Sequence, residues 1–179
     1  SKLYYIKYPI ENSENFITIA TTRPETMLGD TAVAVNPEDK RYKNLVSKNV
    51  ILPIVEKKIK IIADDYADPE QGTGAVKITP AHDFNDYDVG IRNKLEIINI
   101  FSEDGKINKN APEKYIGLDR FEARKQILIE LKNKNLFVKE ENIKNKVPYG
   151  DRSNSIIEPY LTEQWFADAK KLSLKAKKI

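Results

Sequence analysis

The sequence predicts a β-rich α/β fold, in which a curled, barrel-like mixed sheet carries a few flanking helices. Three observations lead to this fold class. Short apolar, β-branched segments separated by turn residues follow one another through the first half of the chain. Only a few segments show the helical period. The length of 179 residues is enough for one domain with a buried core.

The expected strands begin with a hairpin. Residues 4–8 and 16–20 are rich in β-forming side chains and flank a polar turn at residues 11–15. Several of the later candidates are short apolar runs that stop at a proline or at Asn-Pro. These later strands are expected at residues 31–35, 49–52, 58–63, 74–78 and 97–101.

Helices are expected at three places. Asp119 is followed three residues later by Glu122, which is the spacing of a capping box. The helix after it would present one stripe, formed by Phe121, Arg124, Leu128 and Leu131. A proline-led helical turn is expected at residues 24–28, and another helix is expected to begin at Asp83.

Two further segments are expected to be loops, and the basic tail is expected to be a frayed helix. Residues 102–118 and 139–155 have the composition of loops. The basic tail, residues 170–178, alternates Lys with Ala, Leu and Ser. This pattern is typical of a solvated, frayed helix near a chain end, and a patch that faces nucleic acid is the alternative.

Composition excludes several classes of protein. The chain has no Cys and one His, so disulfides, thiolate catalysis, Cys-ligated zinc and a His-rich metal site are excluded, and no metal is expected. No apolar run approaches the ~20 residues of a membrane span, so no membrane partner is expected. The expected location is cytoplasmic, and the lack of Cys is compatible with it. The net charge of +3 permits a nucleic-acid partner without requiring one.

The first motif with chemical potential spans residues 21–30, where an expected strand runs into a Thr-rich turn. Thr21, Thr22 and Thr26 offer hydroxyl groups beside a helix start, where polar or anionic ligand groups can bind. Arg23 offers paired N–H donors to a phosphate or a carboxylate. The alternative is that these residues serve only as capping and turn residues.

The second motif spans residues 72–87, in which Gly72 and Gly74 would allow a close approach to the backbone. Lys77 and Thr79 are two apart and would share one face of a strand. Asp83 and Asp86 are three apart and would be neighbours on a helix. The change from strand to helix would aim all four side chains at one point. The alternative is that both carboxylates only cap the helix or complement its dipole.

His82 is the only imidazole of the chain. It could serve as a general base. No Ser or Cys nucleophile is visibly paired with it, and a structural role beside a helix start is the alternative.

Together the two motifs resemble the editing domain inserted in the class I aminoacyl-tRNA synthetases for valine, leucine and isoleucine. Residues 21–37 are nearly a verbatim signature of the valyl type, and Lys77 marks the second motif as valyl. Residues 157–161 and 164–166 resemble the segment that returns to the synthetase body. The resemblance covers essentially the whole chain.

The resemblance implies one editing domain over residues 1–179, with its core at about 1–165 and a returning segment at 166–179. Its activity would be post-transfer editing, the hydrolysis of mischarged threonyl-tRNA(Val). A bound water would attack the ester, so no protein nucleophile is required. The catalytic residues would be Asp83, Asp86, Lys77 and Thr22, and the substrate-binding residues would be Thr21, Arg23, Thr26, Thr79 and His82.

The resemblance also implies how these residues divide the work. Asp86 would hold the α-ammonium of the substrate, while Asp83, Lys77 and Thr79 would read the threonine hydroxyl. The Thr-rich turn with Arg23 would position the adenosine end and the attacked carbonyl.

No cofactor is expected for the domain, since ATP and Mg would serve the full-length synthetase. The expected partners are the 3′ end of tRNA(Val) carrying threonine and the rest of the synthetase chain. Two alternatives stay open. One is an editing domain of the leucyl or isoleucyl type, against which Lys77 and residues 23–30 argue. The other is a tRNA-docking module without catalysis.

Overall fold

The computed structural model describes residues 1–176, whose strands form two sheets. The first sheet has the order β2-β1-β7 and is antiparallel throughout. Its strands are β1 (Lys2–Pro9), β2 (Phe16–Thr21) and β7 (Phe137–Asn142). The second sheet has the order β4-β5-β3-β6, in which only the β3–β5 pair is parallel. Its strands are β3 (Ala32–Val35), β4 (Asn49–Ile51), β5 (Lys58–Ala63) and β6 (Ala75–Ile78).

The expected hairpin is confirmed as β1 and β2. Ile6 of β1 lies opposite Ile19 of β2, and Tyr8 lies opposite Ile17. All four side chains are buried in the main core, because alternate residues of a strand point to the same face. The other faces of these strands carry more polar side chains.

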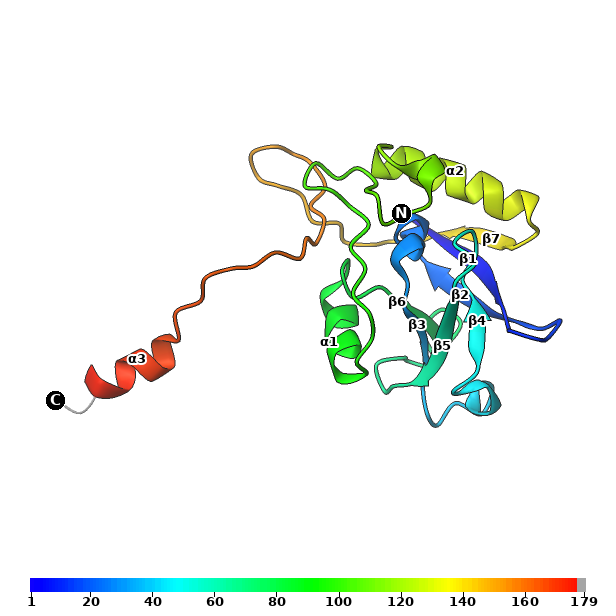
Figure 1. Cartoon of the computed structure of the whole chain (residues 1–179), viewed down its shortest axis with the longest axis horizontal. Coiled ribbons are helices and arrows are strands. Elements are labelled where there is room, and N and C mark those ends of the chain that lie inside the picture. The colour runs from blue at the N-terminus through cyan, green and yellow to red at the C-terminus, as the bar shows by residue number, and fades with distance from the viewer. Residues whose placement is uncertain (177–179) are drawn as a thin grey trace.

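β3 lies between β5 and β6 and is buried along its whole length. Val33 and Val35 pack into the main core, whereas Ala32 and Ala34 pack on the opposite side, against Val89 of helix α1 (Phe84–Arg92). Four later strands were expected at 31–35, 49–52, 58–63 and 74–78, and β3 to β6 confirm them. Figure 1 shows α1 beside the second sheet.

The mixed-sheet architecture with flanking helices is confirmed, but the barrel-like closure is not. Within residues 1–176 the two sheets are joined by an isolated antiparallel bridge between Ile10 and Val50, and no closed barrel forms.

The expected strand at residues 97–101 is wrong, because this segment joins no sheet and makes only an isolated bridge between Phe101 and Ile107. Its backbone N–H groups bond to side chains instead: that of Ile100 donates to His82 Nε2 at 2.9 Å, and that of Phe101 donates to Asn99 Oδ1 at 2.9 Å. The apolar run that suggested a strand still reflects burial, since Ile100 and Phe101 lie in the core.

The expectation of a loop at residues 139–155 is wrong at its start, since β7 extends to Asn142. β7 is an edge strand that pairs only with β1, and most of its side chains are exposed. A solvated edge strand needs no apolar alternation, so its sequence, Phe-Val-Lys-Glu-Glu-Asn, does not show the pattern of a strand. The expected loop at 102–118 holds only the short 3-10 helix η3 (Glu113–Tyr115) and isolated bridges.

The expected helices are confirmed, but α2 buries a different face from the one expected. The turn at 24–28 is the 3-10 helix η1 (Pro24–Gly29), and Asp119 caps α2 (Arg120–Asn133) by accepting the N–H of Phe121 at 2.8 Å. The buried side chains of α2 are Ala123, Ile127 and Leu131, so of the expected stripe only Leu131 is fully buried. A further 3-10 helix, η2 (Lys43–Leu45), follows β3.

After residue 158 the chain extends away from the sheets and forms α3 (Ala169–Ala176), as Figure 1 shows. The helical tail expected at residues 170–178 is therefore confirmed up to residue 176, and residues 177 and 178 lie outside the described residues. The division into a core at about 1–165 and a returning segment at 166–179 stays a prediction.

Candidate active site

A pocket of about 290 Å³ opens where the end of β2, η1, β6 and the start of α1 meet. The two motifs meet here because β3, which directly follows η1, pairs antiparallel with β6 and places Val33 opposite Lys77. Every predicted site residue lines this pocket. These residues are Thr21, Thr22, Arg23, Thr26, Lys77, Thr79, His82, Asp83 and Asp86.

Asp83 is the N-cap of α1. Its backbone is extended, and its Oδ1 accepts hydrogen bonds from the N–H groups of Asn85 at 2.9 Å and Asp86 at 3.2 Å. Asp83 therefore caps the helix, as one of the two interpretations of this residue expected. Since both bonds end on Oδ1, capping leaves Oδ2 free to serve a second role at the pocket.

Asp86 is a buried carboxylate, with 5% of its surface exposed. Its Oδ2 accepts the backbone N–H of Thr79 at 2.9 Å, which joins α1 to the end of β6. Burial raises the pKa of Asp86 to about 6, against the opposing effect of Lys77. The carboxylate is thus mostly ionised at neutral pH and suited to a cationic ligand group.

Lys77 and Thr79 end in a buried polar cluster that sequence reasoning missed. Lys77 Nζ lies 3.1 Å from Asp30 Oδ1 and also contacts the Thr79 hydroxyl, which donates to the same Asp30 oxygen at 2.5 Å. The hydroxyl of Tyr8 donates to the other oxygen of Asp30 at 2.7 Å. The sequence did contain an indication of such a partner. Lys77 lies in an otherwise apolar strand, and a buried Lys requires a carboxylate nearby.

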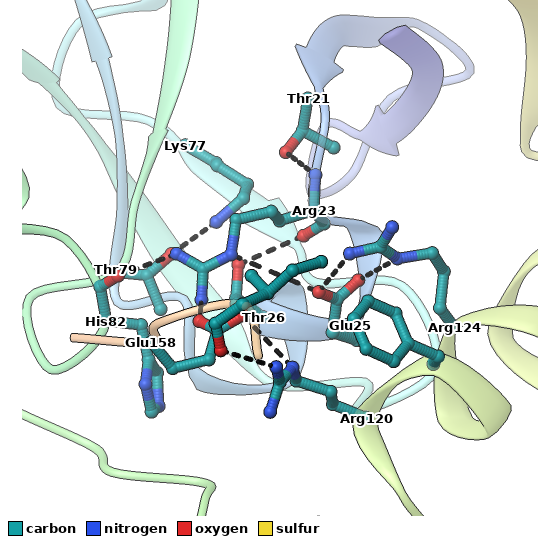
Figure 2. A network of polar contacts seen from close by, with 12 residues as sticks. Thr21, Arg23, Glu25, Thr26, Lys77, Thr79, His82, Arg120, Arg124 and Glu158 are labelled. Atoms are coloured by element: carbon teal, nitrogen blue, oxygen red, sulfur yellow. Dashed lines mark hydrogen bonds and ion pairs between the residues drawn. The ribbon is translucent and has the colours of Figure 1, made fainter. Parts of the chain in front are cut away.

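The Thr-rich turn has the local bonds of a helix start. The hydroxyl of Thr21 accepts the N–H of Arg23 at 3.1 Å, and the hydroxyl of Thr26 donates to the carbonyl of Arg23 at 3.0 Å. Thr21 and Thr26 thus stabilise the turn and also line the pocket, while Thr22 is half-buried at the pocket. Figure 2 shows the Arg23 guanidinium among the site residues, where Nη1 donates to the carbonyl of His82 at 2.8 Å.

His82 is buried, and its Nε2 accepts the N–H of Ile100. The ring packs edge-on against Phe101 with centroids 4.6 Å apart. Burial lowers the pKa of His82 to about 3, with further lowering by Arg23 and Lys77. A neutral ring whose Nε2 is already bonded is poorly suited to general-base catalysis, so the geometry favours the structural alternative.

The glycines of the second motif serve the fold rather than a ligand. Gly72 and Gly74 have positive φ values of 57° and 76°. A Cβ at Gly74 would lie 2.4 Å from Arg41 and 3.1 Å from Asp39, and one at Gly72 would lie 3.2 Å from Ala20. The close approach expected at these glycines is therefore made by the protein's own side chains.

Tyr66, from the loop after β5, also lines the pocket and was not predicted. Burial raises the pKa of its hydroxyl, and the neighbouring carboxylates of Asp86 and Asp83 raise it further. The hydroxyl therefore stays protonated and can donate to a carboxylate or a ligand. No local pattern around residue 66 could have indicated this, because its position depends on the pairing of β5 with β3.

Among residues 1–176, no group of three or more His, Asp or Glu side chains is placed to hold a metal ion. In the same part of the chain, no helix is long and apolar enough to cross a membrane.

The architecture is that of a synthetase editing domain. A family model described as the leucyl-tRNA synthetase editing domain matches residues 45–120. The LeuRS of Agrobacterium radiobacter K84, solved as a ternary complex with tRNA and LeuAMS, superposes with a TM-score of 0.64 at 19% identity, covering 79% of this chain and 20% of that chain. At this identity the likeness concerns the fold alone.

Sequence comparison then identifies the type. The chain is 79% identical over its whole length to a valine–tRNA ligase of Pelagibacter ubique strain HTCC1062, of which it covers 20%. It is 57% identical over 96% of its length to the valine–tRNA ligase of Carboxydothermus hydrogenoformans, and 56% identical over 98% to that of Petrotoga mobilis. The chain spans about a fifth of the length of these relatives. It belongs to the editing domains of the valine–tRNA ligase family.

Proposed function

We propose that the chain is a post-transfer editing hydrolase, which cleaves the ester of threonyl-tRNA(Val). The observation that carries this proposal is the meeting of Lys77, Thr79, Asp83 and Asp86 in one pocket of a chain from the valine–tRNA ligase family. Such a pocket offers both an anionic site for an ammonium group and several donors and acceptors for a hydroxyl group.

The need for such an activity follows from sterics. Threonine and valine have nearly the same shape, and the valyl enzyme is a standard example of an apolar pocket that rejects the added hydroxyl only ~100-fold. A second site that hydrogen-bonds this hydroxyl discriminates far better, because valine would leave its buried polar groups unpaired.

The geometry supports a division of roles among the pocket residues. Asp86, ionised and buried, would hold the α-ammonium. Lys77 has three N–H donors, of which two are directed at Asp30 and Thr79, so one is left for the substrate hydroxyl. The second oxygen of Asp83 would accept the proton of that hydroxyl while the first caps α1.

Water is the proposed nucleophile. It attacks the ester carbon, the bond to the ribose oxygen breaks, and the ribose hydroxyl leaves with a proton. Most of the rate would come from positioning and from stabilising the oxyanion, with the Thr-rich turn and Arg23 at the adenosine end.

The proposal also defines the partners. These are the 3′ end of tRNA(Val) carrying threonine and the rest of a synthetase chain, in which ATP and Mg serve aminoacylation at another site. The exposed side chains of Trp165 and Phe166 on the segment after the core fit a contact with that chain. A cytoplasmic location follows from this role.

The test is deacylation of threonyl, valyl and isoleucyl esters on their tRNAs by the 179-residue chain. We expect preferential loss of threonine from tRNA(Val), without ATP and unchanged by a metal chelator. Preferential hydrolysis of another ester would point to a leucyl- or isoleucyl-type domain. Survival of every ester as in a protein-free control, with the chain shown to be folded, would leave only the tRNA-docking alternative.

A further inference from the structure

The carboxylate of Glu158 links the pocket to a distant part of the chain. Its Oε2 forms an ion pair with Nη2 of Arg23, 135 residues earlier in the sequence. Its Oε1 lies 3.2 Å from Nε of Arg120, on α2. Arg120 also donates from Nη2 to the carbonyl of Ile156 at 3.0 Å, so it contacts the same segment twice. Figure 2 shows Glu158 in contact with both guanidinium groups.

These contacts are largely shielded from water. The side chain of Glu158 is 15% exposed and that of Arg120 is 13% exposed. Burial raises the pKa of Glu158, while Arg23 and Arg120 act in the opposite direction. Charge-assisted hydrogen bonds are roughly twice as strong as neutral ones, so the pair can fix the orientation of a side chain.

Arg23 depends on this contact for its orientation. Its Nη1 donates to the carbonyl of His82, but its Nε has no hydrogen-bond partner among the described residues. The nearest other carboxylate, Glu25, lies 4.0 Å from that Nε and is already bound by two hydrogen bonds from Arg124. Glu158 therefore provides one of the two directional contacts that set the plane of the Arg23 guanidinium.

We propose that Glu158 is a positioning residue for ester hydrolysis, acting through Arg23. It holds the guanidinium at the pocket, where the N–H donors meet the adenosine end of the aminoacyl ester. This inference rests on the proposed function. Because Glu158 lies on the segment that leads out of the core, displacement of that segment would release Arg23 and weaken substrate binding.

The test is a double-mutant cycle on the 179-residue chain. Glu158→Gln keeps the size of the side chain and removes its charge, Arg23→Ala removes the group it orients, and Glu122→Gln on the exposed face of α2 is the matched control. Steady-state hydrolysis of threonyl-tRNA(Val) is measured for each variant and for the double variant. Thermal unfolding verifies that each variant folds.

We expect Glu158→Gln to raise KM about tenfold with kcat within about twofold, because misplacing Arg23 weakens binding away from the reacting carbonyl. In the Arg23→Ala background the same substitution should have no further effect, since Glu158 acts only through Arg23. A KM equal to that of the control would overturn the proposal. The proposal would also be overturned if Glu158→Gln raised KM in the Arg23→Ala background by the same factor as in the wild type.

A second measurement needs no substrate. Rotation of the Arg23 guanidinium, followed by ¹⁵N NMR, should be slow in the wild type and in Glu122→Gln, and fast in Glu158→Gln. Equal rotation in all three would overturn the proposal. A wild type that hydrolyses no ester would refute the proposed function, and NMR alone would then decide whether Glu158 orients Arg23.

Discussion

At the scale of single residues, the candidate site is built from charges withdrawn from water. Asp30 and Asp86 are both buried, and burial raises the pKa of each. Lys77 opposes both increases, so one ammonium group serves two carboxylates. Such a cluster is costly to assemble, because each ion loses solvation before it gains a partner. Its presence in a pocket is typical of a site that must bind a polar ligand.

The pKa of Asp86 leads to a prediction about stability. The folded value of about 6 lies above the ordinary value of 3.8. The neutral carboxyl therefore stabilises the fold below pH ~4, and this contribution is lost as the pH rises through about 6. The difference between the two values corresponds to about 3 kcal/mol.

Asp86→Asn should therefore be more stable than the wild type at pH 7, by up to about 3 kcal/mol, because Asn stays neutral and still accepts the N–H of Thr79. The advantage should shrink towards zero at pH 4. Urea unfolding at both pH values measures it, with Asp88→Asn, at an exposed position of α1, as the control. A constant difference between the two pH values would show that Asp86 does not titrate in this range.

At the scale of elements, the start of α1 carries two carboxylates with different attachments. Asp83 bonds to its own helix, whereas Asp86 bonds back to Thr79 at the end of β6. The turn between β6 and α1 thus places one carboxylate at the rim of the pocket and the other deeper inside. This difference supports separate roles for the two.

Asp83→Ala and Asp86→Ala should accordingly fail in different ways. Loss of the α-ammonium contact in Asp86→Ala should slow threonyl and valyl ester hydrolysis together. Asp83→Ala should instead narrow the preference for threonine over valine. A hydrogen bond to a charged group contributes ~1.5–3 kcal/mol, or roughly 10–150-fold in rate when it forms in the transition state. Deacylation of both esters by each variant is the measurement.

Stability must be followed in the same variants, because loss of the Asp83 cap costs ~1 kcal/mol. Thermal unfolding separates this effect from the loss of a substrate contact, and Asp88→Ala is a control on the same helix. Equal losses on both esters in two folded variants would refute the division of roles, and full activity in both would refute the site itself.

At the scale of the whole molecule, one core holds both sheets together and brings the two motifs to one pocket. The surface is only mildly basic, with a net charge of +3. The segment after residue 158 leaves this core and carries exposed apolar side chains, including Trp165, Phe166 and Leu172. Its basic helix α3 is remote from the sheets in Figure 1.

Binding of tRNA by the chain should therefore depend only moderately on salt. Each neutralised phosphate adds ~0.9 to the slope of log affinity against log salt, so a few contacts give a slope of roughly 3 in magnitude, well below the ~10 of a strongly basic binder. Changing Lys170 and Lys171 of α3 to Gln should leave the slope unchanged if that helix is only solvated. Titrations at several salt concentrations measure the slope, and a decrease of roughly 2 in the variant would instead place the tail on the nucleic acid.

The sequence by itself determined the hairpin, the strands β3 to β6 and the starts of α1 and α2. These features are local, because alternation, proline stops and capping residues each act over a few positions. The match of residues 21–37 and of Lys77 to the valyl type was also readable without a structure.

Only the tertiary structure decided which buried charges meet. Asp30 forms an ion pair with Lys77, and Glu158 forms one with Arg23, which is 135 residues away in the sequence. Tertiary structure also decided two elements of backbone structure. β7 lies at the edge of a sheet, where a strand needs no apolar alternation. Residues 97–101 form no strand, and the N–H of Ile100 in this segment bonds to His82. In each case the partner comes from a distant part of the chain. A local pattern shows that a group must be satisfied, but only the packing of the elements supplies the partner.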